Sequence, residues 1–392
     1  MRMVFINPFY IFSIAFSVAI VLFKMKLSSL FLLDNTEATQ LIILVMVLFC
    51  LIFGFFYSGR LKRFIARSEP GNSSKFNVYM VAMFIIAGTG LEIISSGAIP
   101  FLMVFEGVTY NYREFGIASF HVFFLSYVSA SAIIGFERYI LFGNKRNLLL
   151  TILGVLFSII IVNRAAMLMI ILPCFFIYLS YNAKVKSIVS VLLCFLIIII
   201  TFGYIGDKRM VSSGYTDDKP LFRVAKIDSV VLDSLPSGFS WFYIYASSPY
   251  ANLLYQERNP RYDKGNVTDF LNVAILPDFI SKRIDDTVKS RFPTILITDE
   301  LNATTGFCYA AITFGSLGVI LLYLYMFFIL TLFLMLNRKR HIRAVAALLS
   351  TITAFMIFEN MLVFASCIMQ LILITLFCSK KITLFGRDVN LL

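Results

Sequence analysis

The segment SIVSVLLCFLIIIITFGYI, residues 187–205, decides the fold of this chain. It contains no charged side chain, and a helix that crosses the hydrocarbon core of a bilayer needs about 20 apolar residues. The composition agrees, since 59% of the 392 residues are hydrophobic and 14% are charged. Soluble domains are about 45–50% apolar and about 25% charged. The sequence therefore excludes a water-soluble or disordered protein and predicts an integral membrane protein.

Nine more apolar runs accompany this segment, so we expect an all-α polytopic membrane protein with about ten transmembrane helices. The ten runs lie at about 4–23, 40–58, 77–95, 119–136, 147–163, 165–182, 187–205, 307–335, 344–359 and 361–378. The first lacks a small-residue cleavage site, which favours a retained helix over a cleaved signal peptide. The predicted parts are helices 1–7 in 1–205 with a short external loop at 96–118, a large external loop at 206–306, and helices 8–10 with a tail in 307–392.

The distribution of charge predicts the orientation. With the N-terminus inside, the cytoplasmic segments are 1–3, 59–76, 137–146, 183–186, 336–343 and 379–392, and they hold 18 Lys and Arg residues but three acids. The rest of the chain holds 16 basic and 19 acidic residues. Because Lys and Arg accumulate in cytoplasmic loops, this separation predicts that both termini are cytoplasmic. It also explains the formal charge of +12 without a nucleic-acid partner.

The sequence lacks the motifs of several enzyme classes. The Walker A, GxGxxG, HExxH, GxSxG and CxxC patterns are all absent, which argues against nucleotide-driven pumps and against serine or zinc hydrolases. Two histidines and six scattered cysteines make a metal site unexpected, and we expect no cofactor. The few ionisable residues of the spans, Glu92, Glu359 and Arg164, lie near the external ends. This placement favours a protein that binds or modifies a substrate held at the outer leaflet.

Three external residues are candidate catalytic groups. Arg113 and Arg164 lie at the outer headgroup level, where guanidinium groups can bind the phosphates of a lipid-linked pyrophosphate and stabilise it as a leaving group. The alternative for both is an arginine that extends to lipid headgroups or pairs with Glu92, Glu106 or Glu114. His121 begins a span and is a candidate general base or hydrogen-bond donor, the alternative being a helix-end histidine bound to a backbone carbonyl.

The large loop 206–306 is a candidate sugar-binding surface. It holds 12 basic and 13 acidic residues, and its segment WFYIYASSPYANLLYQERNPRY, residues 241–262, interleaves aromatic and polar side chains. Aromatic rings can stack on the apolar faces of sugars, although an interfacial aromatic belt is the alternative. The candidate substrate contacts are Trp241, Tyr245, Tyr250, Arg258, Arg261 and Arg291, together with Glu114 next to Arg113. Asp278, Asp299 and Glu300 are possible bases with no distinguishing spacing.

Four segments resemble the Wzy-type O-antigen polymerases, the oligosaccharide repeat-unit polymerases. SSGAIPFLMVFEGVTYNYREFGIASFH at 95–121 is similar to the first external loop of that family, and VNRAAMLMIIL at 162–172 to its tight hairpin. YIYASSPYANLLYQ at 243–256 and LNATTGFCYAAITFGSLGVILLY at 301–323 resemble segments near the start and at the exit of its large periplasmic loop. The family's R-x10-G pattern is not evident in 206–306. The positions matched by the resemblance are Arg113, His121, Arg164 and Asn302, whereas Arg258, Arg261 and Arg291 rest on local chemistry.

The resemblance implies a GT-C-like helical membrane glycosyltransferase in the bacterial inner membrane. It would transfer a growing glycan from undecaprenyl pyrophosphate to a lipid-linked repeat unit at the periplasmic face. The partners implied are undecaprenyl-pyrophosphate-linked oligosaccharide, the lipid bilayer and a chain-length regulator protein. Two other functions stay open at this point, an O-antigen ligase that joins finished glycan to lipid A core and a flippase for lipid-linked oligosaccharides. Against the flippase stands the scarcity of polar residues at mid-span.

Overall fold

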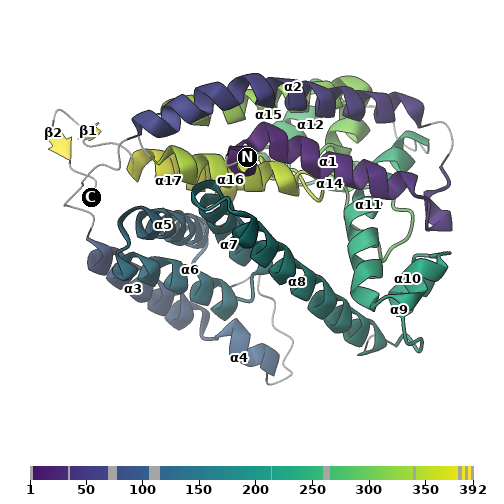
Figure 1. Cartoon of the computed structure of the whole chain (residues 1–392), viewed down its shortest axis with the longest axis horizontal. Helices are drawn as coiled ribbons and strands as arrows, with labels where there is room; N and C mark the ends of the chain where they lie inside the picture. The colour runs from purple at the N-terminus through teal and green to yellow at the C-terminus, as the bar shows by residue number, and fades with distance from the viewer. Residues whose placement is uncertain are drawn as a thin grey trace.

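The protein is almost entirely helical in the part of the chain that the structure describes. The computed structural model describes residues 3–33, 36–68, 77–105, 115–212, 214–258, 265–338, 341–377, 382–384 and 387–389 (Figure 1). Its longer helices are α1 (Pro8–Lys24), α2 (Glu37–Arg67), α3 (Val78–Ser96), α5 (Phe120–Phe142), α6 (Leu148–Ile160), α7 (Arg164–Tyr181), α8 (Val185–Ser212), α11 (Ser237–Arg258), α15 (Cys308–Leu336), α16 (Ile342–Phe355) and α17 (Ala365–Phe377).

Short elements complete the fold. They are the helices α4 (Pro100–Phe105), α9 (Pro220–Val224), α10 (Val230–Ser234), α12 (Val267–Phe270), α13 (Asp278–Ile284) and α14 (Val288–Arg291), the 3-10 turns Val4–Ile6, Ser29–Phe31 and Lys145–Asn147, and the π-helical segment Leu271–Ile275. An antiparallel hairpin of β1 (Ile382–Leu384) and β2 (Arg387–Val389) lies near the C-terminus.

The ten apolar runs lie largely within helices, and six of the described helices are long and apolar enough to cross a membrane. These six are α2, α3, α5, α7, α8 and α15. The helices α1, α16 and α17 are apolar but shorter. Nine residues separate α16 from α17, and within them the Asn360 side chain donates to the Ala274 carbonyl at 2.8 Å and accepts from Leu362 N at 3.1 Å.

Asparagine residues cap the starts of helices, and glycine residues follow their ends, where the apolar runs begin and stop. Asn77 and Asn163 cap α3 and α7 by accepting backbone N–H groups two or three positions into the helix. Gly97 and Gly143 follow α3 and α5 in the left-handed conformation, with φ of 62° and 68°. The tight turn before Arg164, predicted from the sequence, is therefore built on a capped helix start.

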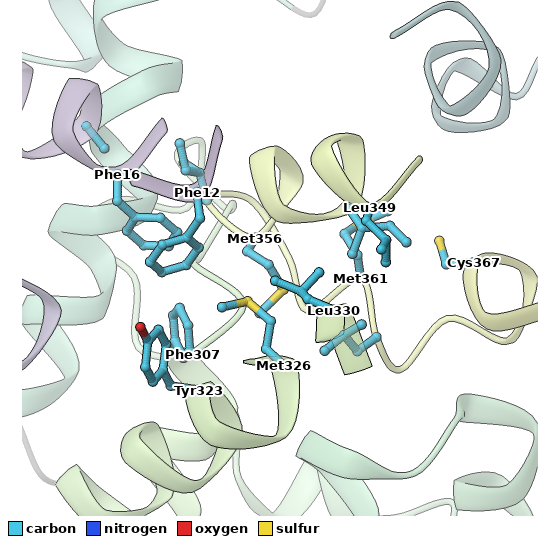
Figure 2. Close-up of a cluster of buried hydrophobic side chains, with 14 of the residues drawn as sticks. Phe12, Phe16, Phe307, Tyr323, Met326, Leu330, Leu349, Met356, Met361 and Cys367 are labelled. Carbon is cyan, nitrogen blue, oxygen red and sulfur yellow. The ribbon is translucent and has the colours of Figure 1, made fainter. Parts of the chain in front are cut away.

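The main core lies between α1, α15, α16 and α17. In Figure 1, α1, α2, α15, α16 and α17 run side by side, and the group of α3, α5, α6 and α7 lies below them. Figure 2 shows Phe12 and Phe16 of α1 reaching toward Phe307 and Tyr323, which lie at and in α15, with the ring centroids of Phe16 and Phe307 5.7 Å apart. Between helices in a bilayer, such rings stabilise the bundle through close van der Waals packing, because lipid tails are as apolar as the rings.

The helix ends next to the segments rich in Lys and Arg lie at one end of the bundle, which we call the basic end. There the α2 residue Lys62, the α7 residue Tyr181 and the α16 residue Arg343 line one cavity. His341, two residues before Arg343 in the chain, is hydrogen-bonded to Glu137 of α5 at 2.6 Å. The opposite helix termini form what we call the loop end, because they contact the segment 206–306.

Contacts at the loop end join distant parts of the chain. The Leu27 backbone N–H, just after α1, donates to the hydroxyl of Tyr243 in α11 at 3.0 Å. The Asp278 carboxylate in α13 accepts from the backbone N–H of Ala365 at the start of α17 at 3.1 Å. The helix α11 and the short helices around it thus cover one end of the bundle.

The region predicted as a large external loop is mostly helical. It contains six helices, α9 to α14, within the described residues, and α8 continues past the predicted end at 205. The α8 and α11 backbones cross closely, since a Cβ on Gly203 would lie 2.2 Å from the Gly238 Cα. Beyond this crossing α8 is mostly exposed, with 6% of its most apolar window buried, so its surface faces lipid or solvent (Figure 1).

Candidate functional site

A buried glutamate and a histidine form a pair at the loop end. The Nδ1 atom of His121, at the start of α5, lies 3.0 Å from both carboxylate oxygens of Glu92, in the last turns of α3. The Glu92 side chain is fully buried, whereas that of His121 is 22% exposed. A buried carboxylate needs a donor to offset its desolvation, and His121 supplies it. The sequence singled out both residues but did not predict that they are partners.

The segment between α3 and α5 holds this pair in place. The backbone N–H of Gly116 donates to the Ser96 hydroxyl at 2.7 Å, which ties the loop to the end of α3. The Phe115 ring, which is buried, contacts the His121 ring edge-on at a centroid distance of 5.8 Å. Gly116 has φ of 90°, so its backbone can pass close to both members of the pair.

The geometry fits a histidine that takes or gives a proton. When the Glu92 carboxylate accepts from Nδ1–H, a neutral His121 carries its free lone pair on Nε2. A carboxylate that orients an imidazole in this tautomer and stabilises the imidazolium is the arrangement found in general-base catalysis. The helix-end alternative, a histidine bound only to a backbone carbonyl, does not describe His121.

The positive charges of two arginines act on Tyr245 of α11. Arg164 is the exposed first residue of α7, and Arg209 lies exposed near the end of α8. Partial burial raises the pKa of the Tyr245 hydroxyl, and the positive charges of Arg209 and Arg164 oppose this rise. Among the described residues, no carboxylate lies within ion-pair distance of Arg164. The phenol of Tyr245 therefore lies within the electrostatic influence of two guanidinium groups at the loop end.

Arg209 is the residue that sequence reasoning did not assign to the site. It belongs to the part of α8 that extends beyond the predicted end of the span at 205. The sequence signal that could have identified Arg209 is its position just past the apolar run, two residues after Asp207. The Asp207 carboxylate accepts from the Trp241 indole Nε1 at 2.8 Å, which links this end of α8 to α11.

Two of the predicted sugar-stacking rings are packed inside the protein. Trp241 is 7% exposed and lies against Gly206, where an added Cβ would come within 2.5 Å of the indole ring. Tyr250 is 1% exposed and contacts Phe23 edge-on at 5.4 Å. Neither ring offers a face on which a sugar could stack in this structure. Tyr245 is 42% exposed, and its ring packs against those of Trp241 and Phe202.

The other predicted residues occupy different surroundings. Arg291 is ion-paired with Asp269 at 3.0 Å and with Asp285, so its guanidinium holds α12 and α14 together. Asn302 is exposed. Arg113, Glu114 and Arg261 lie outside the described residues, as does the side chain of Arg258. Among the three possible bases, Asp278 accepts from the start of α17, Glu300 accepts from the Tyr215 hydroxyl at 3.0 Å, and Asp299 is exposed.

A methyl group at Gly116 should disturb the pair of Glu92 and His121. An added Cβ there would lie 2.8 Å from the His121 Nδ1 and 3.0 Å from the Glu92 Oε1. Gly97 is the matched control, because it also has positive φ but nothing lies within 4 Å of its added Cβ. We expect Gly97→Ala to lower the free energy of unfolding by about 1–2 kcal/mol through backbone strain alone. Gly116→Ala should lower it further in thermal unfolding of the purified protein, and equal losses would contradict this account.

The carboxylate of Asp285 should make stability depend on acid pH. Its pKa is lowered by hydrogen bonds from the Thr287 hydroxyl and backbone N–H and by the charge of Arg291. A carboxyl group whose pKa is lowered on folding stabilises at neutral pH, and this contribution is lost as the pH falls through the folded-state value. We expect Asp285→Asn to be less stable than wild type at pH 7, with the difference closing as unfolding is measured below about pH 4. A difference that persists at low pH would contradict this.

The chain matches no protein-family model, no curated protein and no solved structure. Among the described residues, no group of three His, Cys, Asp or Glu side chains is arranged to hold a metal ion. The loop end holds a carboxylate-oriented imidazole and, separately, a half-exposed phenol under the influence of two cations. These can accept a proton and bind a polyanionic group.

Proposed function

We propose that this protein is a multi-pass glycosyltransferase of the bacterial inner membrane that polymerises surface polysaccharide. It transfers the growing glycan from undecaprenyl pyrophosphate to the next lipid-linked repeat unit at the periplasmic face. The observation that carries the proposal is the pair of Glu92 and His121 at the loop end, in which a buried carboxylate orients an imidazole at 3.0 Å. Arg164 has no carboxylate within ion-pair distance among the described residues and is not needed on that side for topology, so a bound anion gives its guanidinium a role. The resemblance of four segments to O-antigen polymerases supports the same function.

The proposal includes ten spans with both termini in the cytoplasm. In this arrangement the chain alternates between the basic end and the loop end, and successive long helices are antiparallel. The clustering of Lys62 and Arg343 at one end and the His121–Glu92 pair at the other supports this alternation. The positive-inside rule then places the basic end in the cytoplasm and the loop end in the periplasm.

The residues divide the proposed chemistry between them. His121 Nε2 takes the proton of the acceptor hydroxyl, and the hydroxyl oxygen forms a bond to the anomeric carbon of the donor glycan. The bond from that carbon to the pyrophosphate oxygen breaks, and undecaprenyl pyrophosphate leaves with the electron pair. Arg164 and Arg209 stabilise the negative charge that grows on the leaving group, which lowers the barrier because the contact strengthens in the transition state.

Reconstitution tests the function directly. The purified protein is placed in proteoliposomes with lipid-linked repeat units extracted from a host strain that lacks this gene, and the glycans are separated by gel electrophoresis. A ladder of products with increasing repeat number is the expected result. Transfer only to added lipid A core would instead indicate a ligase. Movement of repeat units across the bilayer without elongation would indicate a flippase, and either outcome would contradict polymerisation.

A further inference from the structure

A cavity of about 450 Å³ opens at the basic end, on the opposite side of the bundle from the candidate site. Lys62 near the end of α2 and Arg343 at the start of α16 line it, together with Tyr181, the last residue of α7. The side chains of Met3 and Ile65 form an apolar part of the cavity wall. The cavity therefore combines two cationic groups with an apolar surface, and it lies where the apolar runs of the helices end.

The guanidinium of Arg343 is held in a fixed position but is not fully satisfied. Its Cζ atom lies 3.6 Å from the centroid of the Tyr181 ring, so the two groups stack. Its Nη1 atom is buried and has no hydrogen-bond partner among the described residues. A buried donor without an acceptor is unfavourable. Arg343 itself lines the cavity, so an anion bound there lies next to its guanidinium group. Guanidinium groups bind phosphate oxygens especially well.

The charges around the cavity favour an anion. Lys62 is exposed and carries no ion pair with a described carboxylate, and Arg60 and Arg63 flank it on α2. The nearby carboxylate of Glu137 does not line the cavity and is hydrogen-bonded to His341 at 2.6 Å. Negative charge in the neighbourhood is thus already partnered, whereas the positive charge of Lys62 and Arg343 is directed to the cavity.

We propose that this cavity binds the phosphate headgroup of an anionic phospholipid from the leaflet at the basic end. Lys62 and Arg343 contact the phosphate, and one acyl chain lies against the apolar side chains of Met3 and Ile65. Basic pockets between transmembrane helices on the cytoplasmic side commonly bind anionic headgroups. The apolar wall favours a lipid over free phosphate, which has no hydrocarbon to bury. This site is independent of the proposed glycosyl transfer.

Native mass spectrometry of the full chain tests the site. Protein is released from nanodiscs that contain equal amounts of phosphatidylglycerol and phosphatidylcholine, and the lipids that stay bound are counted. We expect wild type to retain phosphatidylglycerol in preference to phosphatidylcholine. Each lost cation near an anionic headgroup should weaken retention roughly fivefold, so Lys62→Gln with Arg343→Gln should reduce it about 25-fold. Arg63→Gln changes the same net charge on the same helix outside the cavity lining and should retain the lipid.

Several outcomes would overturn the site. Equal retention of the two lipids would show that the cavity does not recognise charge, and unchanged retention in the double variant would remove Lys62 and Arg343 from it. Displacement of phosphatidylglycerol by equimolar inorganic phosphate would show that the cavity binds free anion and not lipid. Lys62→Gln alone serves if the double variant does not fold, because the Lys62 side chain is exposed and its replacement leaves the core intact.

Discussion

His121→Ala should reduce the rate of glycan elongation by about 10²- to 10⁴-fold, the usual contribution of a positioned general base. The reason is that Nε2 of His121 takes the acceptor proton in the proposed reaction, while Nδ1 is held by Glu92 at 3.0 Å. Glu92→Gln should also slow elongation, because the amide can hold the ring but does not stabilise the imidazolium. The measurement is the initial rate of ladder formation in proteoliposomes with matched amounts of folded protein.

The second histidine of the chain is a matched control. His341 is also hydrogen-bonded to a buried glutamate, Glu137, but at the basic end. Its backbone is left-handed, with φ of 44°, a conformation that asparagine tolerates. We expect His341→Asn to elongate glycans at nearly the wild-type rate. Long glycan chains made at the normal rate by His121→Ala would show that His121 is not the base.

Arg164→Ala should slow elongation by about 10²- to 10³-fold, comparable to the loss of one oxyanion-stabilising donor in other enzymes. The guanidinium of Arg164 has no carboxylate partner among the described residues, so it is available for the pyrophosphate. Arg164→Lys should also be impaired, because an ammonium group lacks the planar fork that binds two phosphate oxygens together. The effect should fall on kcat more than on KM if the contact strengthens in the transition state.

Arg223→Ala is the control for a lost surface cation at the loop end. Arg223 pairs with Asp217 at 3.1 Å and is 76% exposed, and such a pair contributes little. We expect this variant to keep nearly the full rate. If Arg164→Ala and Arg223→Ala elongated glycans equally well, the pyrophosphate role of Arg164 would be wrong.

The positions of the helices could be predicted because a membrane span depends on the apolar character of its own residues and not on distant contacts. An apolar run such as 187–205 needs no partner to become a helix in a bilayer, since every backbone group is satisfied within the segment. The region 206–306 was harder, because its short helices depend on contacts with the bundle. The capping box of Asn266 and Asp269, for example, is a local signal for only a four-residue helix.

The pairing of residues in the site depends on tertiary structure. Glu92 and His121 are 29 residues apart, and no local pattern links them. Trp241 looked like a sugar-binding ring because its neighbours in sequence are aromatic and polar. Its burial follows from Gly206 on another helix, whose missing side chain leaves room for the indole. Aromatic content alone cannot separate a ring that binds ligand from one that fills such a gap.

The sparse packing of α8 has a practical consequence for handling the protein. Near the loop end its backbone touches α11 where Gly203 meets Gly238, and only 6% of its most apolar window is buried against the rest of the protein. Lipid tails are as apolar as leucine, so the bilayer supports such a helix without a protein partner. Detergent micelles do not reproduce this lateral support. Extraction in native nanodiscs, with the surrounding lipids kept, is therefore the preparation in which Arg209 should hold its place beside Tyr245.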